Sequence, residues 1–130
     1  MIAWKKLTGS VLAAAVAVTA VASQASAKEI VVKMGADTGV LNFVPAKFDA
    51  APGDTIKWKL NKAGPHNAVF DSAKSADGAV ATGLSQKKLL VKPGDSYVST
   101  IPKTAKPGTY AFNCVPHKAA GMVGVLTIKK

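Results

Sequence analysis

Turn signals recur about every ten residues from residue 28 to the end of the chain, and the runs between them lack helical periodicity. The clearest turns are Pro52-Gly53-Asp54, Pro93-Gly94-Asp95 and Lys106-Pro107-Gly108. In the run Thr55–Leu60, apolar residues alternate with lysines, which is typical of a half-buried strand. Short strands at this spacing favour an all-β, Greek-key antiparallel β-sandwich of about eight strands.

The strands that this pattern predicts are Glu29–Met34, Phe43–Phe48, Thr55–Leu60, His66–Asp71, Leu84–Val91, Ser96–Ile101, Thr109–Cys114 and Val123–Lys129. Phe43–Phe48 is interrupted by Pro45, which cannot donate to a strand ladder, so we expect it at a sheet edge. Residues 72–83 are small and polar, and they predict a surface loop with at most one helical turn.

Residues 1–27 have the organisation of a cleaved signal peptide. Lys5 and Lys6 precede an apolar stretch of about 16 residues, and Ala25 and Ala27 form an A-x-A cleavage pattern. An uncleaved anchor is the alternative, although the apolar stretch is shorter than the roughly 18–20 residues that cross a bilayer. We therefore expect export and a single mature domain over residues 28–130, peripheral to a membrane at most.

The mature domain is strongly basic. Without Lys5 and Lys6, 15 lysines, no arginine and 7 acidic residues remain, which gives a net charge of +8. Such a charge raises the possibility of nucleic-acid binding, but export, the lack of arginine and the lack of interleaved aromatic residues argue against it. A lysine-rich surface is either simply solvated or attracts an acidic partner.

Soft and borderline metal ligands gather in the last third of the chain. Cys114, His117 and Met122 stand at positions i, i+3 and i+8, and His66 is the only other histidine. One thiolate, two imidazoles and a thioether are the donors of a blue-copper centre. Zinc is the nearest rival, but it is bound by sulfur of cysteine rather than of methionine. A single cysteine excludes an internal disulfide. Each of the four candidate ligands, taken alone, could instead be an ordinary core or surface residue.

Two segments resemble the plastocyanin family of the cupredoxins. Residues 65–71 (PHNAVFD) are similar to the strand that carries the family's first histidine, and 114–124 (CVPHKAAGMVG) to its copper loop. The resemblance spans the mature chain and implies a cupredoxin-like fold with one copper ion, Cu(I)/Cu(II). The ligands that it implies are His66, Cys114, His117 and Met122.

The resemblance also assigns roles around the copper. It implies that Asn67 ties the His66 strand to the Cys114 loop, and that an apolar docking patch surrounds His117. The residues of this patch would be Leu41, Pro65 and Ala120, although Leu41 could instead be ordinary core. Most members carry an exposed tyrosine just before the copper-binding cysteine, and this chain has Asn113, so we expect electrons to enter by the His117 edge.

The resemblance implies a monomeric one-electron carrier rather than an enzyme. Its electron donor would be cytochrome f and its electron acceptor photosystem I, in the thylakoid lumen. The basic charge of the domain favours a cyanobacterial rather than a plant member. The alternative is a periplasmic, pseudoazurin-like cupredoxin that serves another redox chain, although pseudoazurins have fewer residues between the first histidine and the cysteine. A Cys114–His117 hydrolase or transferase and a metal-free adhesion module are further alternatives, which stoichiometric copper binding would exclude.

Overall fold

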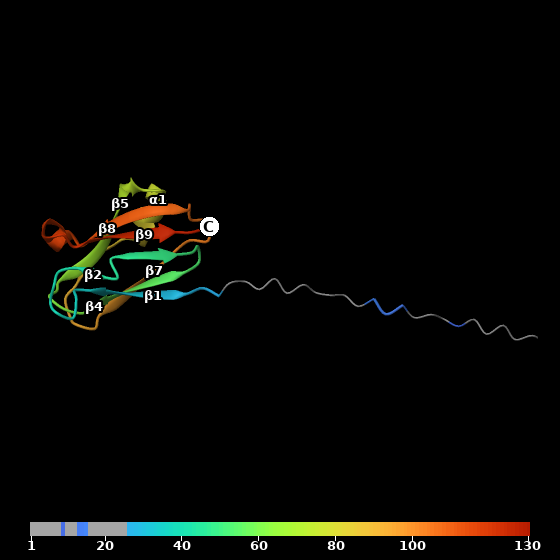
Figure 1. Cartoon of the computed structure of the whole chain (residues 1–130), viewed down its shortest axis with the longest axis horizontal. Helices are drawn as coiled ribbons and strands as arrows, with labels where there is room; N and C mark the ends of the chain where they lie inside the picture. The colour runs from blue at the N-terminus through green and yellow to red at the C-terminus, as the bar shows by residue number, and fades with distance from the viewer. Residues whose placement is uncertain (1–8, 10–12, 16–25) are drawn as a thin grey trace, which may run out of the picture.

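The computed structural model describes residues 9, 13–15 and 26–130, and it folds residues 29–128 into two stacked β-sheets (Figure 1). The first sheet contains, in spatial order, β2 (Phe43–Val44), β1 (Glu29–Met34), β4 (Thr55–Leu60) and β7 (Ser96–Thr100). The second contains β3 (Lys47–Ala50), β9 (Val123–Ile128), β8 (Gly108–Asn113), β5 (His66–Ser75) and β6 (Gln86–Leu90). The predicted β-sandwich is confirmed. Most of the predicted signal peptide lies outside the described residues.

The sheets are mixed rather than purely antiparallel. β1 pairs in parallel with β4, and β3 pairs in parallel with β9, whereas the other pairings are antiparallel. The segment predicted as one edge strand, Phe43–Phe48, explains part of this difference. It divides at Pro45 into β2 of the first sheet and β3 of the second. Because proline cannot donate to a ladder, the chain leaves one sheet there and joins the other.

One further expectation is wrong. Residues 72–83 are not a loop with at most one helical turn, because β5 continues to Ser75 and the helix α1 spans Gly78–Leu84. Asp77 caps this helix by accepting hydrogen bonds from the backbone N–H groups of Ala79 and Val80. Ala81 and Leu84, both in this helix, are buried, so tertiary packing stabilises a helix that its small residues do not predict.

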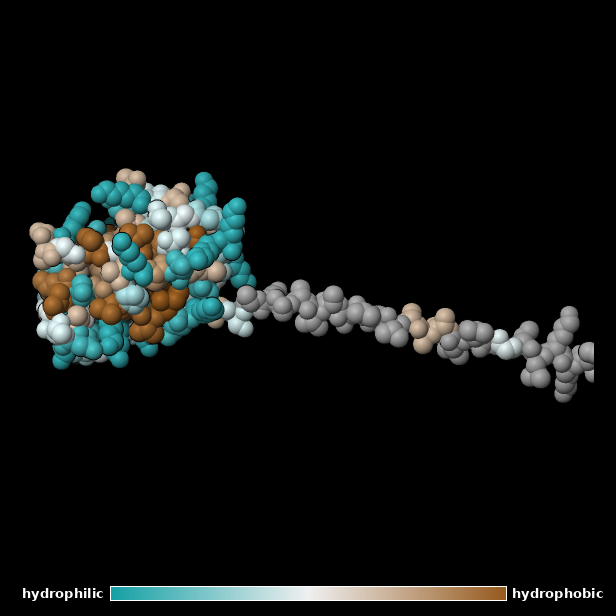
Figure 2. All heavy atoms as spheres, in the orientation of Figure 1, coloured by the Kyte–Doolittle hydropathy of each residue, from teal (hydrophilic) through white to brown (hydrophobic). Residues whose placement is uncertain are grey.

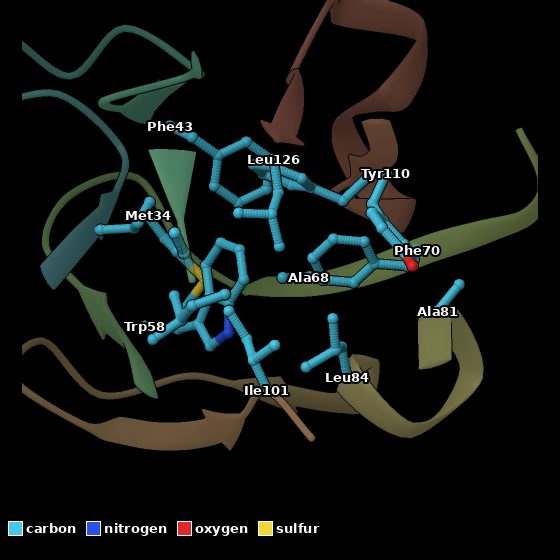
Figure 3. Packing of buried hydrophobic residues seen from close by; sticks show 14 of the residues in the cluster. Met34, Phe43, Trp58, Ala68, Phe70, Ala81, Leu84, Ile101, Tyr110 and Leu126 are labelled. Carbon is cyan, nitrogen blue, oxygen red and sulfur yellow. The ribbon is translucent and has the colours of Figure 1, made fainter. Parts of the chain in front are cut away.

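Trp58 lies at the centre of the core between the sheets (Figure 3). Its ring lies edge-on to Phe112 at 5.1 Å between centroids and to Phe43 at 5.8 Å. Its indole N–H donates to Ser99 Oγ at 3.0 Å, and Ser99 in turn donates to the Leu84 carbonyl at 2.7 Å. The prediction that the apolar residues of β4 face the core is confirmed, because Ile56, Trp58 and Leu60 are buried. The one polar side-chain atom among them, the indole nitrogen of Trp58, is hydrogen-bonded.

The topology brings the predicted ligands to one end of the sandwich. β5 is antiparallel to β8, with Val69 opposite Asn113, so the start of β5 lies beside the end of β8. A 3₁₀-helix, η1 (Val115–Ala120), connects β8 to β9 at this end, and Figure 1 shows it at the end opposite the C-terminus. On the face drawn in Figure 2, hydrophobic residues gather toward this end and across the middle. No helix of the described residues is long and apolar enough to cross a membrane.

Candidate metal centre

His66 is the first residue of β5 and is fully buried. Its Nε2 lies 2.6 Å from the carbonyl oxygen of Lys62. Because a carbonyl oxygen only accepts hydrogen bonds, Nε2 must carry the proton, which leaves a lone pair on Nδ1. This backbone contact therefore selects the tautomer in which Nδ1 is free to bind a metal.

Gly35 makes the contact between Lys62 and His66 possible. Its φ is +87°, and a Cβ at this position would lie 2.0 Å from the Lys62 carbonyl oxygen and 3.1 Å from His66 Nε2. A side chain here would displace the group that orients the imidazole. The neighbouring Asn61 donates a hydrogen bond of 2.9 Å to the Gly35 carbonyl, so the two loops are held together.

Cys114 is the N-cap residue of η1, and His117 lies in the first turn of this helix. Cys114 follows β8 and precedes η1, and the backbone N–H of His117 donates to its carbonyl at 3.1 Å. Residues at i and i+3 eclipse one another in a 3₁₀-helix. The sequence predicted a loop here without this helix, and the helix is what turns the thiol and the imidazole toward the same point.

Three donor atoms converge on that point. His66 Nδ1 lies 3.6 Å from Cys114 Sγ, His117 Nδ1 lies 3.5 Å from the same sulfur, and the two nitrogens are 3.2 Å apart. The point equidistant from these three atoms lies about 2 Å from each, which is close to the ~2.0–2.3 Å of metal–nitrogen and metal–sulfur bonds. The residues present therefore fit a metal ion held by two imidazoles and one thiolate.

Burial shifts the pKa values of the two fully buried converging donors, His66 and Cys114. It lowers the pKa of His66, an effect that the Lys62 carbonyl partly opposes, so this imidazole is neutral and can donate its lone pair. Burial raises the pKa of the Cys114 thiol, which the backbone amides of Asn67 and His117 partly offset. A metal ion must therefore displace the thiol proton when it binds.

Met122 is fully buried and stands two residues after the end of η1. Its carbonyl accepts a hydrogen bond of 3.1 Å from the Cys114 N–H, and its own N–H donates to the His117 carbonyl at 3.2 Å. Gly121 ends η1 in the left-handed conformation, with φ of 88°, which a residue with a side chain rarely adopts. The backbone of Met122 is thus fixed to both of the loop's other candidate ligands.

Asn67 connects the two halves of the site. Its Oδ1 accepts a hydrogen bond of 2.9 Å from the Val115 N–H, and its Nδ2 donates to the Lys87 carbonyl at 3.0 Å. It thus joins β5, β6 and the start of η1. The contacts of Lys62 and Lys87 are made by their carbonyl groups, which no side-chain pattern could have indicated.

The three residues predicted for docking differ in exposure. Pro65, which precedes His66, and Ala120, which ends η1, are exposed. Leu41 is half-buried and packs against the core, so the alternative considered for it holds in part. His117 is itself half-buried, and its ring lies 5.0 Å from that of His66 between centroids.

Residues 30–129 match the copper-binding proteins of the plastocyanin/azurin family. The chain is 48% identical to plastocyanin of Nostoc punctiforme over 107 residues, which cover 81% of this chain and 77% of that protein. Among solved structures, it resembles oxidised plastocyanin of the fern Dryopteris crassirhizoma with a TM-score of 0.65 and 33% identity, covering 76% of this chain and 99% of that one.

The structure is also similar to pseudoazurin of Methylobacterium extorquens, with a TM-score of 0.52 and 27% identity over 78% of this chain and 76% of that one. The resemblance seen in the two sequence motifs is confirmed over most of the chain, and copper is the cofactor that it implies. The chain belongs to the plastocyanin/azurin family of copper-binding proteins, as a plastocyanin homologue that carries electrons and is not an enzyme.

Proposed function

We propose that His66, Cys114, His117 and Met122 hold one copper ion and that the protein carries single electrons in photosynthesis. The observation that carries this proposal is the convergence of His66 Nδ1, Cys114 Sγ and His117 Nδ1 within 3.2–3.6 Å of one another. When bound, copper supplies the Cu(I)/Cu(II) couple that the side chains of this domain lack.

The chain's own residues keep the site rigid. Lys62 fixes the His66 ring, Asn67 fixes the start of η1, and the Met122 backbone closes the loop. Three of the four donor residues, His66, Cys114 and Met122, are fully buried, so they exclude water from the inner side of the site. Donors held in place in this way need little rearrangement when the charge of the site changes, which favours fast electron exchange.

His117 is the route by which electrons enter and leave. It is the half-buried member of the three converging donors, whereas His66 and Cys114 are both fully buried. Pro65, just before His66, and Ala120, two residues before Met122, offer small apolar surfaces to a partner, and Leu41 supports them. A partner that docks on this patch would bring its redox centre close to the His117 ring.

We assign cytochrome f as the donor and photosystem I as the acceptor, in the lumen of a cyanobacterial thylakoid. The 48% identity to a cyanobacterial plastocyanin supports this assignment. The larger TM-score with a plastocyanin than with a pseudoazurin, 0.65 against 0.52, also supports it over a periplasmic role in another redox chain. Residues 1–27 would direct export, and the mature protein would act as a monomer.

The net charge of +8 on residues 28–130 would steer the protein toward acidic docking surfaces. Association rates should then fall as salt screens these charges, over a Debye length of about 10 Å at 0.1 M ionic strength. Stopped-flow reduction by cytochrome f and flash-induced reoxidation by photosystem I particles, each over a range of salt concentrations, test this directly.

Ala120→Glu places a charge in the proposed docking patch, and Ala73→Glu is the matched control on the exposed part of β5. We expect Ala120→Glu to slow both reactions at least about tenfold, because a desolvated charge at an interface is costly. Ala73→Glu should change them only through its net charge. Equal effects of the two variants, or no reaction with photosystem I, would contradict the proposal.

A further inference from the structure

Asp54 is a buried carboxylate at the end of the sandwich that carries the start of β1. It follows the turn at Pro52-Gly53 and is 6% exposed. Its Oδ1 accepts a hydrogen bond of 2.9 Å from the backbone N–H of Lys28, and its Oδ2 accepts one of 2.9 Å from that of Ala51. Both donors are neutral amides, and within the described chain Asp54 forms no ion pair.

A buried carboxylate without a cation is costly, because neutral amides replace only part of its hydration. The nearest basic side chains do not supply the missing charge. Lys129 pairs with Asp49 at 3.0 Å, and Lys103 lies with Lys28 around the same cavity of about 730 Å³ without an ion pair to Asp54. The Lys28 side chain forms no ion pair with Asp54 either. Among the described residues around this cavity, the group that remains is the backbone nitrogen of Lys28.

The fold fixes the position of that nitrogen. The Lys28 carbonyl accepts a hydrogen bond of 2.9 Å from the Thr55 N–H, and its N–H donates to Asp54, so both backbone groups of Lys28 are held. β1 begins one residue later (Figure 1). Ser26 and Ala27 are exposed and belong to no helix or strand, which leaves the bond between Ala27 and Lys28 accessible.

We propose that hydrolysis of the Ala27–Lys28 bond makes Lys28 the amino terminus, and that its α-ammonium forms an ion pair with Asp54. A signal-peptidase-type enzyme with a preference for small residues would add one water molecule across the amide. Ala27 keeps a carboxylate, and the Lys28 nitrogen becomes an amine that binds a proton. A neutral hydrogen bond thereby becomes a charge-assisted one at the same position.

This inference rests on the proposed removal of residues 1–27. It adds that this cleavage stabilises the folded domain by creating an ion pair. The pairing is specific to one terminus. A chain that begins at Ala27 presents a neutral amide to Asp54, and a chain that begins at Glu29 lacks the donor altogether. Within the described chain, every buried core residue lies between Val32 and Ile128, so the described residues that cleavage removes contribute none of them.

The first experiment compares the copper-loaded processed protein with the chain extended by Ala27, each with Asp54 and with Asp54→Asn. Asparagine keeps the size but only one of the two acceptor oxygens. This loss is the same in both chains, so it cancels when the difference between the chains is compared. By urea unfolding, the equilibrium constant of the extended chain should be about tenfold larger than that of the processed protein, as expected for a charge-assisted bond. In the Asp54→Asn pair this difference should disappear. A difference that survives the substitution, or none in the native pair, would overturn the ion pair.

The second experiment needs no variant. Sequencing the amino terminus of the exported protein should identify Lys28, and NMR titration of its ¹³C-dimethylated α-amine should give a pKa above the usual ~7.7–8.0 of an amino terminus. The charged residues that line the cavity at this amine are Asp49, Asp54, Lys28, Lys103 and Lys129, and among them only the carboxylates raise its pKa. A different terminus would refute the cleavage, whereas an ordinary or lowered pKa at Lys28 would refute the pairing alone.

Discussion

Asn67 Oδ1 accepts a hydrogen bond of 2.9 Å from the backbone N–H of Val115, a residue 48 positions further along the chain. This contact ties the strand that begins with His66 to the turn that carries Cys114 and His117. The amide group also donates to the Lys87 carbonyl at 3.0 Å, so one side chain fixes three segments. Asn67 therefore fixes the distance between the strand that carries His66 and the turn that carries Cys114 and His117.

Asn67→Ala should weaken both the fold and the metal site. It leaves the Val115 N–H and the Lys87 carbonyl without their partner, at about 1–3 kcal/mol for each group that stays buried. Loss of an outer contact of this kind typically lowers metal affinity about 10–100-fold. Urea unfolding of the metal-free protein and copper titration measure the two effects. Asn113→Ala is the control, and an equal loss in both variants would argue against the bridging role.

Gly35→Ala should disturb His66 through the Lys62 carbonyl. The control is Gly39→Ala, because Gly39 has nearly the same φ, +86° against +87°, and a Cβ there would meet nothing within 4 Å. Both variants should lose about 1–2 kcal/mol from the left-handed backbone. Only Gly35→Ala should also weaken copper binding, by about tenfold or more, since its Cβ displaces the group that orients the imidazole. Equal copper affinities would contradict this account.

Tyr97 should make the protein sensitive to alkali. Its Oη is buried without a well-formed hydrogen bond to the described residues, and burial raises the pKa of Tyr97, an effect that the Ala68 backbone only partly offsets. The pKa of Tyr97 in the folded state exceeds the unfolded value of ~10. The contribution of neutral Tyr97 to the free energy of unfolding is therefore fully present below pH ~10 and is lost as the pH rises further.

Tyr97→Phe should therefore shift the alkaline unfolding midpoint upward with little change at pH 7. Tyr110→Phe is the comparison, because burial raises the pKa of Tyr110 as well, but its hydroxyl donates a hydrogen bond of 2.7 Å to the Lys106 carbonyl. That variant should lose about 1 kcal/mol at neutral pH. Circular dichroism between pH 7 and 12 follows both proteins. An unchanged alkaline midpoint in Tyr97→Phe would show that another group causes the transition.

Asn113→Tyr tests the route of the electron. Asn113 is half-buried on the face of β8 opposite Cys114, and the introduced ring would restore the tyrosine that most plastocyanins carry there. If electrons pass through His117, the rate of reduction by cytochrome f should change by less than about twofold, as for an ordinary surface substitution. A large acceleration at an unchanged reduction potential would establish a second route beside Asn113.

Local patterns were sufficient to predict most of the sandwich. The alternation in Thr55–Leu60 correctly placed Ile56, Trp58 and Leu60 in the core, because side chains of a strand point to opposite faces in turn. The parallel pairing of β1 with β4 was not predictable in this way. It depends on where the chain crosses between sheets, which is decided by long-range packing rather than by the residues of either strand.

The candidate ligands were predictable because their side chains carry the chemistry. Cys114 and both histidines stand out by residue type, and the structure brings them together. The groups that orient them were not visible in the sequence. The Lys62 and Lys87 contacts use carbonyl oxygens that every residue possesses, and the need for glycine at Gly35 arises only when two distant loops approach each other.

The measurement that tests the central claim most directly is the visible spectrum of the mature domain with one equivalent of Cu(II), before and after ascorbate. A site made of His66, Cys114, His117 and Met122 should give an intense blue thiolate-to-copper band that bleaches on reduction and returns on oxidation. Cys114→Ser should abolish the band. A pale protein, or one whose thiol is simply oxidised by the metal, would contradict the assignment of these four residues as the copper site.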